Sequence, residues 1–148
     1  MESSLDLFVH SLKPGDTVYD VGSHVGMYEV FLAQVVGEKG MVVAFEPHPG
    51  TYEQLLENIR LNGLANVRSF QKAVGEGNSQ EKPYIGDVIA NFSLRAGAIE
   101  GPPYKEGVPF QLVEVVQGDP FVPAQGLPAP RAVKIDVEGF EYAVIRGL

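Results

Sequence analysis

The chain has 148 residues and no cysteine, 45% of its residues are hydrophobic, and its formal net charge is −8 at pH 7. These values predict one folded domain, exclude disulfides and thiolate metal sites, and argue against nucleic acid or an anionic membrane as the main partner, because both are bound by clustered Lys and Arg. No apolar run reaches the ~18 residues of a membrane span, and the first four residues do not resemble a signal peptide, so we expect a cytoplasmic protein.

Residues 1–16 are predicted to form a short N-terminal helix and a turn, because apolar residues recur at helical spacing before the breaker Lys13-Pro14-Gly15. Residues 17–74 are predicted to form a cofactor-binding βαβαβ unit, with strands at 17–21, 41–45 and 67–74. Two helices are expected between these strands, and their apolar stripes comprise Met27, Val30, Phe31 and Val35 in the first and Tyr52, Leu55, Leu56 and Ile59 in the second. This order favours an open parallel sheet with right-handed crossovers.

Residues 75–130 are predicted to be an irregular insertion. Its first part, up to Phe110, carries six glycines and four prolines between short β-like pieces at 84–89 and 92–95. A strand is expected over 110–116. Four prolines then fall within 120–130, where we expect neither a helix nor a central strand.

Residues 131–148 are predicted to hold the fourth strand, Ala132 to Val137, and the start of a helix with the apolar stripe Phe140, Ala143 and Val144. The expected fold is therefore α/β, a Rossmann-like open and mainly parallel sheet with helices on both faces, in the strand order 3-2-1-4. In this order the fourth strand lies at an edge of the sheet, and the fold is expected to be truncated after that strand. Because an apolar edge strand is an aggregation hazard, we expect the chain to form a homo-oligomer through the edge strand at 132–137.

The segment from Asp20 to Gly26 is typical of a loop that binds a cofactor. An acid ends the strand, glycines let the backbone turn tightly, and the next helix begins with free N–H groups. Taken alone, the loop fits an ordinary strand-to-helix turn equally well. Glu46 ends the second strand, where an acid suits ribose hydroxyls, and Asp136 ends the fourth. These groups are expected to converge at the carboxyl ends of the strands, where open α/β sheets bind ligands.

The loop also bears on which cofactor fits. A dinucleotide pyrophosphate is bound by G-x-G-x-x-G, whereas His24 stands here where the middle glycine would be. A bulky residue crowds pyrophosphate, so an adenosine ligand without phosphates is favoured, and S-adenosylmethionine is the common cofactor of that kind. An NAD-dependent oxidoreductase is the less favoured alternative.

Several segments together resemble the FkbM-type methyltransferases. They are VYDVGSHVGMY (18–28), AFEPHP (44–49), Asn58 with Asn62-Gly63, AVG (73–75), KIDVEGFE (134–141) and Arg146-Gly147. The Glu-Pro-x-Pro and Lys-Ile-Asp-Val-Glu-Gly segments are the most specific of these. The resemblance runs from about Thr17 to the last residue. It implies a class I methyltransferase that moves the methyl group of S-adenosylmethionine to a hydroxyl oxygen of a small metabolite, sugar or polyketide.

The resemblance also implies roles by position. The methionine part of the cofactor is expected at Asp20, Gly22, Ser23 and Gly26, with His24 and Tyr28 in the same pocket. Glu46 is expected at the ribose, and Ala73 with Val74 beside the adenine. Asp136 and Glu138 are the expected catalytic residues, as a general base or as groups that orient the acceptor. For Glu138, a helix N-terminal acid that interacts with the macrodipole is the simpler alternative.

No metal site is expected, because His24 and His48 lack partners at ligand spacing. Lys134 stays open between a structural and a functional role. A truncated, non-catalytic methyltransferase-like domain that only binds cofactor or a partner is the alternative function. The acceptor itself cannot be inferred from the sequence.

Overall fold

A computed structural model describes residues 4–82, 84–85, 92–93 and 112–148. Its centre is a four-stranded parallel sheet in the order β3-β2-β1-β9. The strands are β1 (Thr17–Val21), β2 (Met41–Phe45), β3 (Val67–Phe70) and β9 (Ala132–Ile135). The predicted fold class and strand order are confirmed, and β9 lies at an edge of this sheet, as expected.

Helices cover both faces of the sheet. Helix α1 (Ser4–His10) precedes β1, α2 (Met27–Val36) connects β1 to β2, and α3 (Pro49–Leu61) connects β2 to β3. One face packs beneath α2 in a cluster of buried residues, with Phe8 and Ala132 against it: Leu12, Val18, Leu32, Ala33, Val36 and Val42. Every residue of β1 is buried, as a strand covered on both faces must be.

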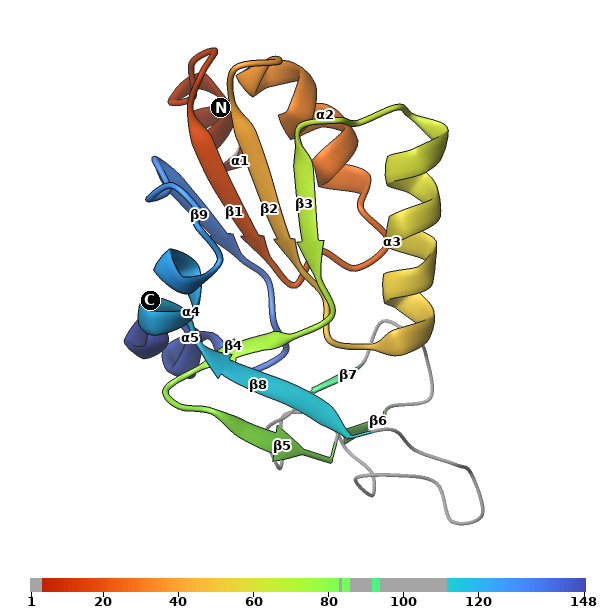
Figure 1. Cartoon of the computed structure of the whole chain (residues 1–148), viewed down its shortest axis with the longest axis vertical. Coiled ribbons are helices and arrows are strands. Elements are labelled where there is room, and N and C mark those ends of the chain that lie inside the picture. The colour runs from red at the N-terminus through yellow and green to blue at the C-terminus, as the bar shows by residue number, and fades with distance from the viewer. Residues whose placement is uncertain (1–3, 83, 86–91, 94–111) are drawn as a thin grey trace.

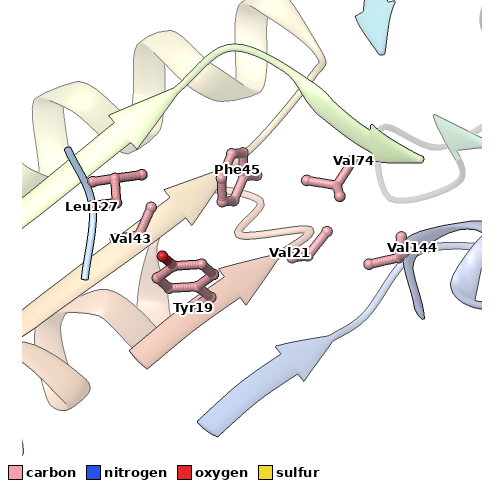
Figure 2. Packing of buried hydrophobic residues seen from close by; sticks show 7 residues of the cluster. All are labelled: Tyr19, Val21, Val43, Phe45, Val74, Leu127 and Val144. Carbon is pink, nitrogen blue, oxygen red and sulfur yellow. The ribbon is translucent and has the colours of Figure 1, made fainter. Parts of the chain in front are cut away.

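The opposite face packs against Val74 and against residues of the segment 121–148. Helices α4 (Gly118–Ala124) and α5 (Glu141–Gly147) belong to this side. Figure 2 shows the cluster that joins them to the sheet: Tyr19, Val21, Val43, Phe45, Val74, Leu127 and Val144. The hydroxyl of Tyr19 donates to the carbonyl of Pro128 at 2.6 Å, which fixes the segment after α4 to the sheet.

A second sheet lies beyond the carboxyl ends of the central strands (Figure 1). It has the order β4-β8-β5, with β4 (Ala73–Gly75), β8 (Val113–Gln117) and β5 (Ser79–Glu81). Strand β8 pairs in parallel with β4 and antiparallel with β5. A two-stranded ladder joins β6 (Tyr84–Ile85) to β7 (Phe92–Ser93), within the predicted β-like pieces, and the other residues of those pieces lie outside the described residues.

Two predicted elements are corrected. The strand expected over 67–74 is broken, because the N–H of Lys72 donates to the carbonyl of Phe70 at 2.9 Å in a tight turn, and the chain then enters the second sheet. The expectation of no helix within 120–130 is wrong, since α4 runs through Pro120 and Pro123. Pro120 lies in the first helical turn, where a backbone N–H has no intrahelical partner to lose.

The buried face of α2 also differs from the predicted stripe. Met27 is 78% exposed and Phe31 47% exposed, whereas the side chain of Glu29 is fully buried. The division into residues 1–16, 17–74, 75–130 and 131–148 stays a prediction. No helix in the described part of the chain has the length and apolar character needed to cross a membrane.

Candidate functional site

A cavity of about 340 Å³ opens at the carboxyl ends of the central strands, within the usual size range of ligand pockets. The chain proceeds from β1 outward to β2 and β3, and β9 lies on the other side of β1. Open α/β sheets bind ligands at such a switch point. The cavity wall includes Gly22, Ser23, His24, Tyr28, Glu46, His48, Lys72, Ala73, Val74, Lys134, Asp136, Val137, Glu138 and Phe140.

The loop after β1 follows a backbone path that requires glycine at Gly22. This residue has a φ of +87°, and a Cβ there would lie 2.1 Å from the carbonyl oxygen of Asp136. The N–H groups of Gly22 and Ser23 both donate to the carbonyl of Phe45, at 2.9 and 3.1 Å. The loop is therefore wedged between the ends of β2 and β9, and a side chain at Gly22 would separate them.

His24 takes the same kind of left-handed backbone without being glycine. Its φ is +52°, and it is the one non-glycine residue with positive φ in the part of the chain that the structure describes. The sequence argument that His24 replaces a glycine thus has a conformational counterpart. The backbone keeps a turn that glycine favours, while the exposed side chain forms part of the cavity wall.

The carboxylate of Glu46 joins two loops. One oxygen accepts the backbone N–H of His24 at 2.9 Å and the other accepts the N–H of His48 at 2.8 Å. Burial raises the pKa of Glu46, while the two N–H donors act in the opposite direction. Each oxygen keeps a lone pair for a further donor, so the carboxylate can still accept hydroxyl groups from a ligand.

His48 caps α3. Its Nδ1 accepts the backbone N–H of Thr51 at 3.2 Å, which requires a ring nitrogen without a proton. Burial lowers the pKa of His48, and the neighbouring His24 lowers it further. The neutral ring is therefore the form suited to the cap, at the rim where α3 meets the cavity.

An ionic cluster joins the cavity wall to the buried side chain of Asp20. The Nζ of Lys134 is 2.9 Å from Oδ1 of Asp20 and 3.7 Å from Oδ2 of Asp136, and it lies 4.5 Å from the centroid of the Tyr28 ring. Asp20 and Lys134 are register partners on adjacent strands, which brings together residues 114 positions apart. Burial raises the pKa of Asp20, and Lys134 opposes that rise.

Helix α2 adds a second buried carboxyl group to this cluster. Glu29 is fully buried, and its burial together with the charge of Asp20 raises its pKa to about 8. At neutral pH the carboxyl group of Glu29 is therefore mostly protonated.

The two predicted catalytic residues follow β9 at the mouth of the cavity. The N–H of Asp136 donates to the carbonyl of Val21 at 2.9 Å, whereas its side chain is 74% exposed. Glu138 is also exposed and lines the cavity. Both side chains are thus exposed where they line the cavity.

Of the residues predicted from the sequence, the cavity brings together Gly22, Ser23, His24, Tyr28, Glu46, Ala73, Val74, Asp136 and Glu138. Asp20 and Gly26 lie behind its wall. Asp20 is fully buried against Lys134, and a Cβ on Gly26 would lie 2.5 Å from Cδ1 of Leu55, so Gly26 allows α3 to approach. The described residues contain no group of three or more His, Cys, Asp or Glu that could hold a metal ion.

Sequence reasoning missed Glu29 and Lys72 and left Lys134 open. For Lys134 the signal was present, because a charged residue inside an apolar strand needs a buried partner. For Lys72 there was little signal, since its place in the wall depends on the turn that ends β3. Glu29 looked like an ordinary acid in the first turn of a helix.

Comparisons with known proteins give one consistent result. Residues 20–148 match the family described as the Methyltransferase FkbM domain. The hexuronic acid methyltransferase AglP of Haloferax volcanii is 29% identical over 143 residues, covering 96% of this chain and 54% of that protein. The 31-O-demethyl-FK506 methyltransferase FkbM of Streptomyces tacrolimicus is 29% identical over 160 residues, covering 93% of this chain and 61% of that protein.

The chain thus spans little more than half the length of these curated relatives. A solved SAM-dependent methyltransferase from Aquifex aeolicus is 33% identical over an alignment that covers 49% of this chain and 38% of that chain, with a TM-score of 0.42. The strand order, rather than this likeness, identifies the fold.

Proposed function

This chain belongs to the FkbM methyltransferase family, and from that premise we propose that it is an S-adenosylmethionine-dependent methyltransferase acting on a hydroxyl oxygen of a small metabolite, sugar or polyketide. The observation that carries the proposal is the position of Glu46. Its carboxylate lies at the end of β2, is held by two backbone N–H groups, and faces a cavity at the switch point of the sheet. An acid in this position suits the two hydroxyls of a ribose.

The charges of the wall support a cationic ligand. Lys72 and Lys134 line the cavity, and each is paired with an acid that does not line it, Glu114 at 2.5 Å and Asp20 at 2.9 Å. The wall thus carries three acids, Glu46, Asp136 and Glu138, against two cations that already have acidic partners outside it. A positive sulfonium and ammonium group fit that wall better than the two phosphates of NAD do.

The residues fit the cofactor as follows. Gly22 and Ser23 would hold its methionine end, with Asp20 behind them, Glu46 its ribose, and the buried pair Ala73 and Val74 its adenine. Bound there, S-adenosylmethionine supplies an electrophilic methyl group. Tyr28 and His24 complete the pocket. Hydroxyl acceptors are proposed because the relatives that the chain matches over almost its whole length include a 31-O-demethyl-FK506 methyltransferase, whose name specifies an oxygen as the methylated atom.

Asp136 and Glu138 are proposed to orient the acceptor hydroxyl and to accept its proton. Both are exposed at the cavity mouth, where an acceptor would enter. General-base help contributes about 10²–10⁴ in rate, so Asp136→Asn should lower turnover by no more than that, while leaving cofactor affinity within a few-fold. A variant that binds cofactor more weakly but turns over normally would instead make Asp136 a binding residue.

The direct test is isothermal titration calorimetry with S-adenosylhomocysteine. We expect one site per chain, and no heat at millimolar ligand would contradict the proposal. If the ligand binds but no hydroxyl acceptor is methylated, the chain is a cofactor-binding domain without activity of its own. The formal charge of −8 supports a small or glycan-like acceptor over nucleic acid. Self-association through β9 also remains a proposal, which light scattering at high concentration tests.

A further inference from the structure

Three carboxyl oxygens beneath the loop after β1 accept no hydrogen bond of ordinary length and angle from the described residues. They are Oδ2 of Asp20 and both carboxyl oxygens of Glu29. Both side chains are fully buried, so water cannot serve them from the surface. Buried acceptors without donors are costly, and this cluster therefore requires a physical explanation.

A single proton on one of the two carboxyl groups would give most of these oxygens a hydrogen-bond partner. Two ionised carboxylates can only accept hydrogen bonds, and the side chains of Asp20 and Glu29 interact directly. If one group is protonated, it becomes a donor to the other. Asp20 has the ammonium of Lys134 at 2.9 Å, whereas no cation among the described residues lies beside Glu29, so the proton belongs on Glu29. Ser23 is the other polar side chain that interacts with Glu29, and its hydroxyl donates to the backbone carbonyl of Asp20 at 2.9 Å.

The remaining charges near the pair act on Asp20 in opposite directions. Asp136, from the segment after β9, adds a negative charge that disfavours ionisation of Asp20, whereas Lys134 on β9 favours it and is the one cation that interacts with the pair in the described part of the chain. A second negative charge on Glu29 would face Asp20, and the backbone N–H of Glu29 and the hydroxyl of Ser23 would compensate that charge only in part. A neutral Glu29 that donates to Oδ2 leaves Asp20 ionised and free to hold Lys134 through Oδ1.

We propose that Glu29 is a positioning residue, whose neutral carboxyl group donates a hydrogen bond to Asp20 and thereby fixes the ammonium of Lys134 in the cavity wall. Lys134 then lies over the ring of Tyr28, next to Asp136, where both Lys134 and Tyr28 face the ligand. Glu29 itself does not line the cavity. This inference rests on the proposed function in one respect: S-adenosylhomocysteine is the ligand whose binding reports the position of Lys134.

The protonation of Glu29 can be tested without any ligand. Nuclear magnetic resonance of protein labelled with ¹³C at the glutamate carboxyl carbons follows each group from pH 3 to pH 10, and comparison with Glu29→Gln identifies Glu29. We expect Glu29 to titrate well above the other glutamates, and its midpoint to fall in Asp20→Asn, where the neighbouring charge is gone. A midpoint of Glu29 near 4.5, the ordinary value for a glutamate, would overturn the proposal.

The positioning role is tested with two substitutions of similar size. Glu29→Gln keeps a donor for Asp20, whereas Glu29→Met removes it, and Glu53→Met makes the same change at an exposed position of α3. Calorimetry with S-adenosylhomocysteine should give affinities within a few-fold of the natural chain for Glu29→Gln and Glu53→Met. Glu29→Met should bind about tenfold more weakly at pH 6 and recover as the pH rises and Asp20 ionises again.

The outcomes separate the two proposals. If Glu29→Gln and Glu29→Met bind equally well at every pH, Glu29 positions nothing, although the proposed function stands. If the natural chain binds no ligand, the proposed function fails, and the carboxyl titration alone still decides whether Glu29 carries the proton. Loss of folding in Glu29→Met, seen by circular dichroism, leaves that titration as the deciding measurement.

Discussion

The carboxylate of Glu46 accepts the backbone N–H of His24 at 2.9 Å, across 22 positions of sequence. Through its other oxygen it also holds His48, so one buried side chain fixes the loop after β1 to the loop after β2. The His24 N–H can make this bond because its backbone takes a left-handed φ. The proposed ribose site is therefore the same group that sets the distance between the two loops.

Glu46→Gln should weaken both the fold and the ligand site. The amide keeps one acceptor oxygen and brings its NH₂ group toward a backbone N–H, so one buried hydrogen bond is lost. We expect a loss of about 1–3 kcal/mol in the free energy of unfolding by urea and at least a tenfold weaker affinity for S-adenosylhomocysteine. Glu57→Gln, on the exposed surface of α3, is the matched control. Equal affinities in the two variants would contradict the role of Glu46.

Gly22→Ala should destabilise far more than an ordinary glycine substitution. Its Cβ would meet the carbonyl of Asp136, in a backbone conformation that side chains disfavour. Gly63→Ala is the control, because its φ of +61° has the same sign but nothing lies within 4 Å of the added carbon. We expect a cost of roughly 1–2 kcal/mol for Gly63→Ala and clearly more for Gly22→Ala in urea unfolding. Similar costs for Gly22→Ala and Gly63→Ala would mean that β9 shifts easily to make room for the added carbon at Gly22.

Glu29 should make the fold less stable as the pH rises. Its pKa is about 8 in the folded chain against an ordinary value of 4.5, so the folded state holds the proton more tightly than the unfolded state. This stabilisation is complete below about pH 4.5 and is lost as the pH rises to about 8. The difference in unfolding free energy between the natural chain and Glu29→Gln should change by a few kcal/mol over that range. A constant difference would show that Glu29 titrates normally.

His48 should give the opposite dependence at acid pH. Burial, followed by the charge of His24, lowers its pKa below the ordinary 6.5, so its stabilisation is complete above pH 6.5 and is lost as the pH falls below it. His48→Asn keeps a capping acceptor without titrating, and His48→Ala should cost about 0.5–2 kcal/mol. His10→Asn, at an exposed position of α1, is the control. An unchanged acid dependence in His48→Asn would exclude this role.

The parts of the fold that the sequence predicts best are those whose residues are buried on both sides. The expected bounds of β1 and β2 agree with the structure, because both strands are mostly apolar and are buried on both faces. The face of α2 was not predictable in the same way. Apolar Met27 lies at the cavity and is exposed, while charged Glu29 turns inward toward Asp20.

The site residues also differ in how far the sequence predicts them. Glu46 and Asp136 could be placed from strand ends alone, since parallel strands bring their carboxyl ends to one edge. The partner of Asp20 could not, because it depends on the register of β9 against β1 over 114 positions. Helix α4 escaped prediction because composition alone does not show that Pro120 falls in its first turn, where proline is tolerated, or that the short helix also contains Pro123.

The crystal structure of this chain with S-adenosylhomocysteine tests the central claim most directly. The account predicts the ribose hydroxyls on the carboxylate of Glu46, the adenine beside Ala73 and Val74, and the sulfur facing the side from which Asp136 and Glu138 approach. A ligand bound elsewhere on the protein, or seated in the cavity with its ribose away from Glu46, would contradict it.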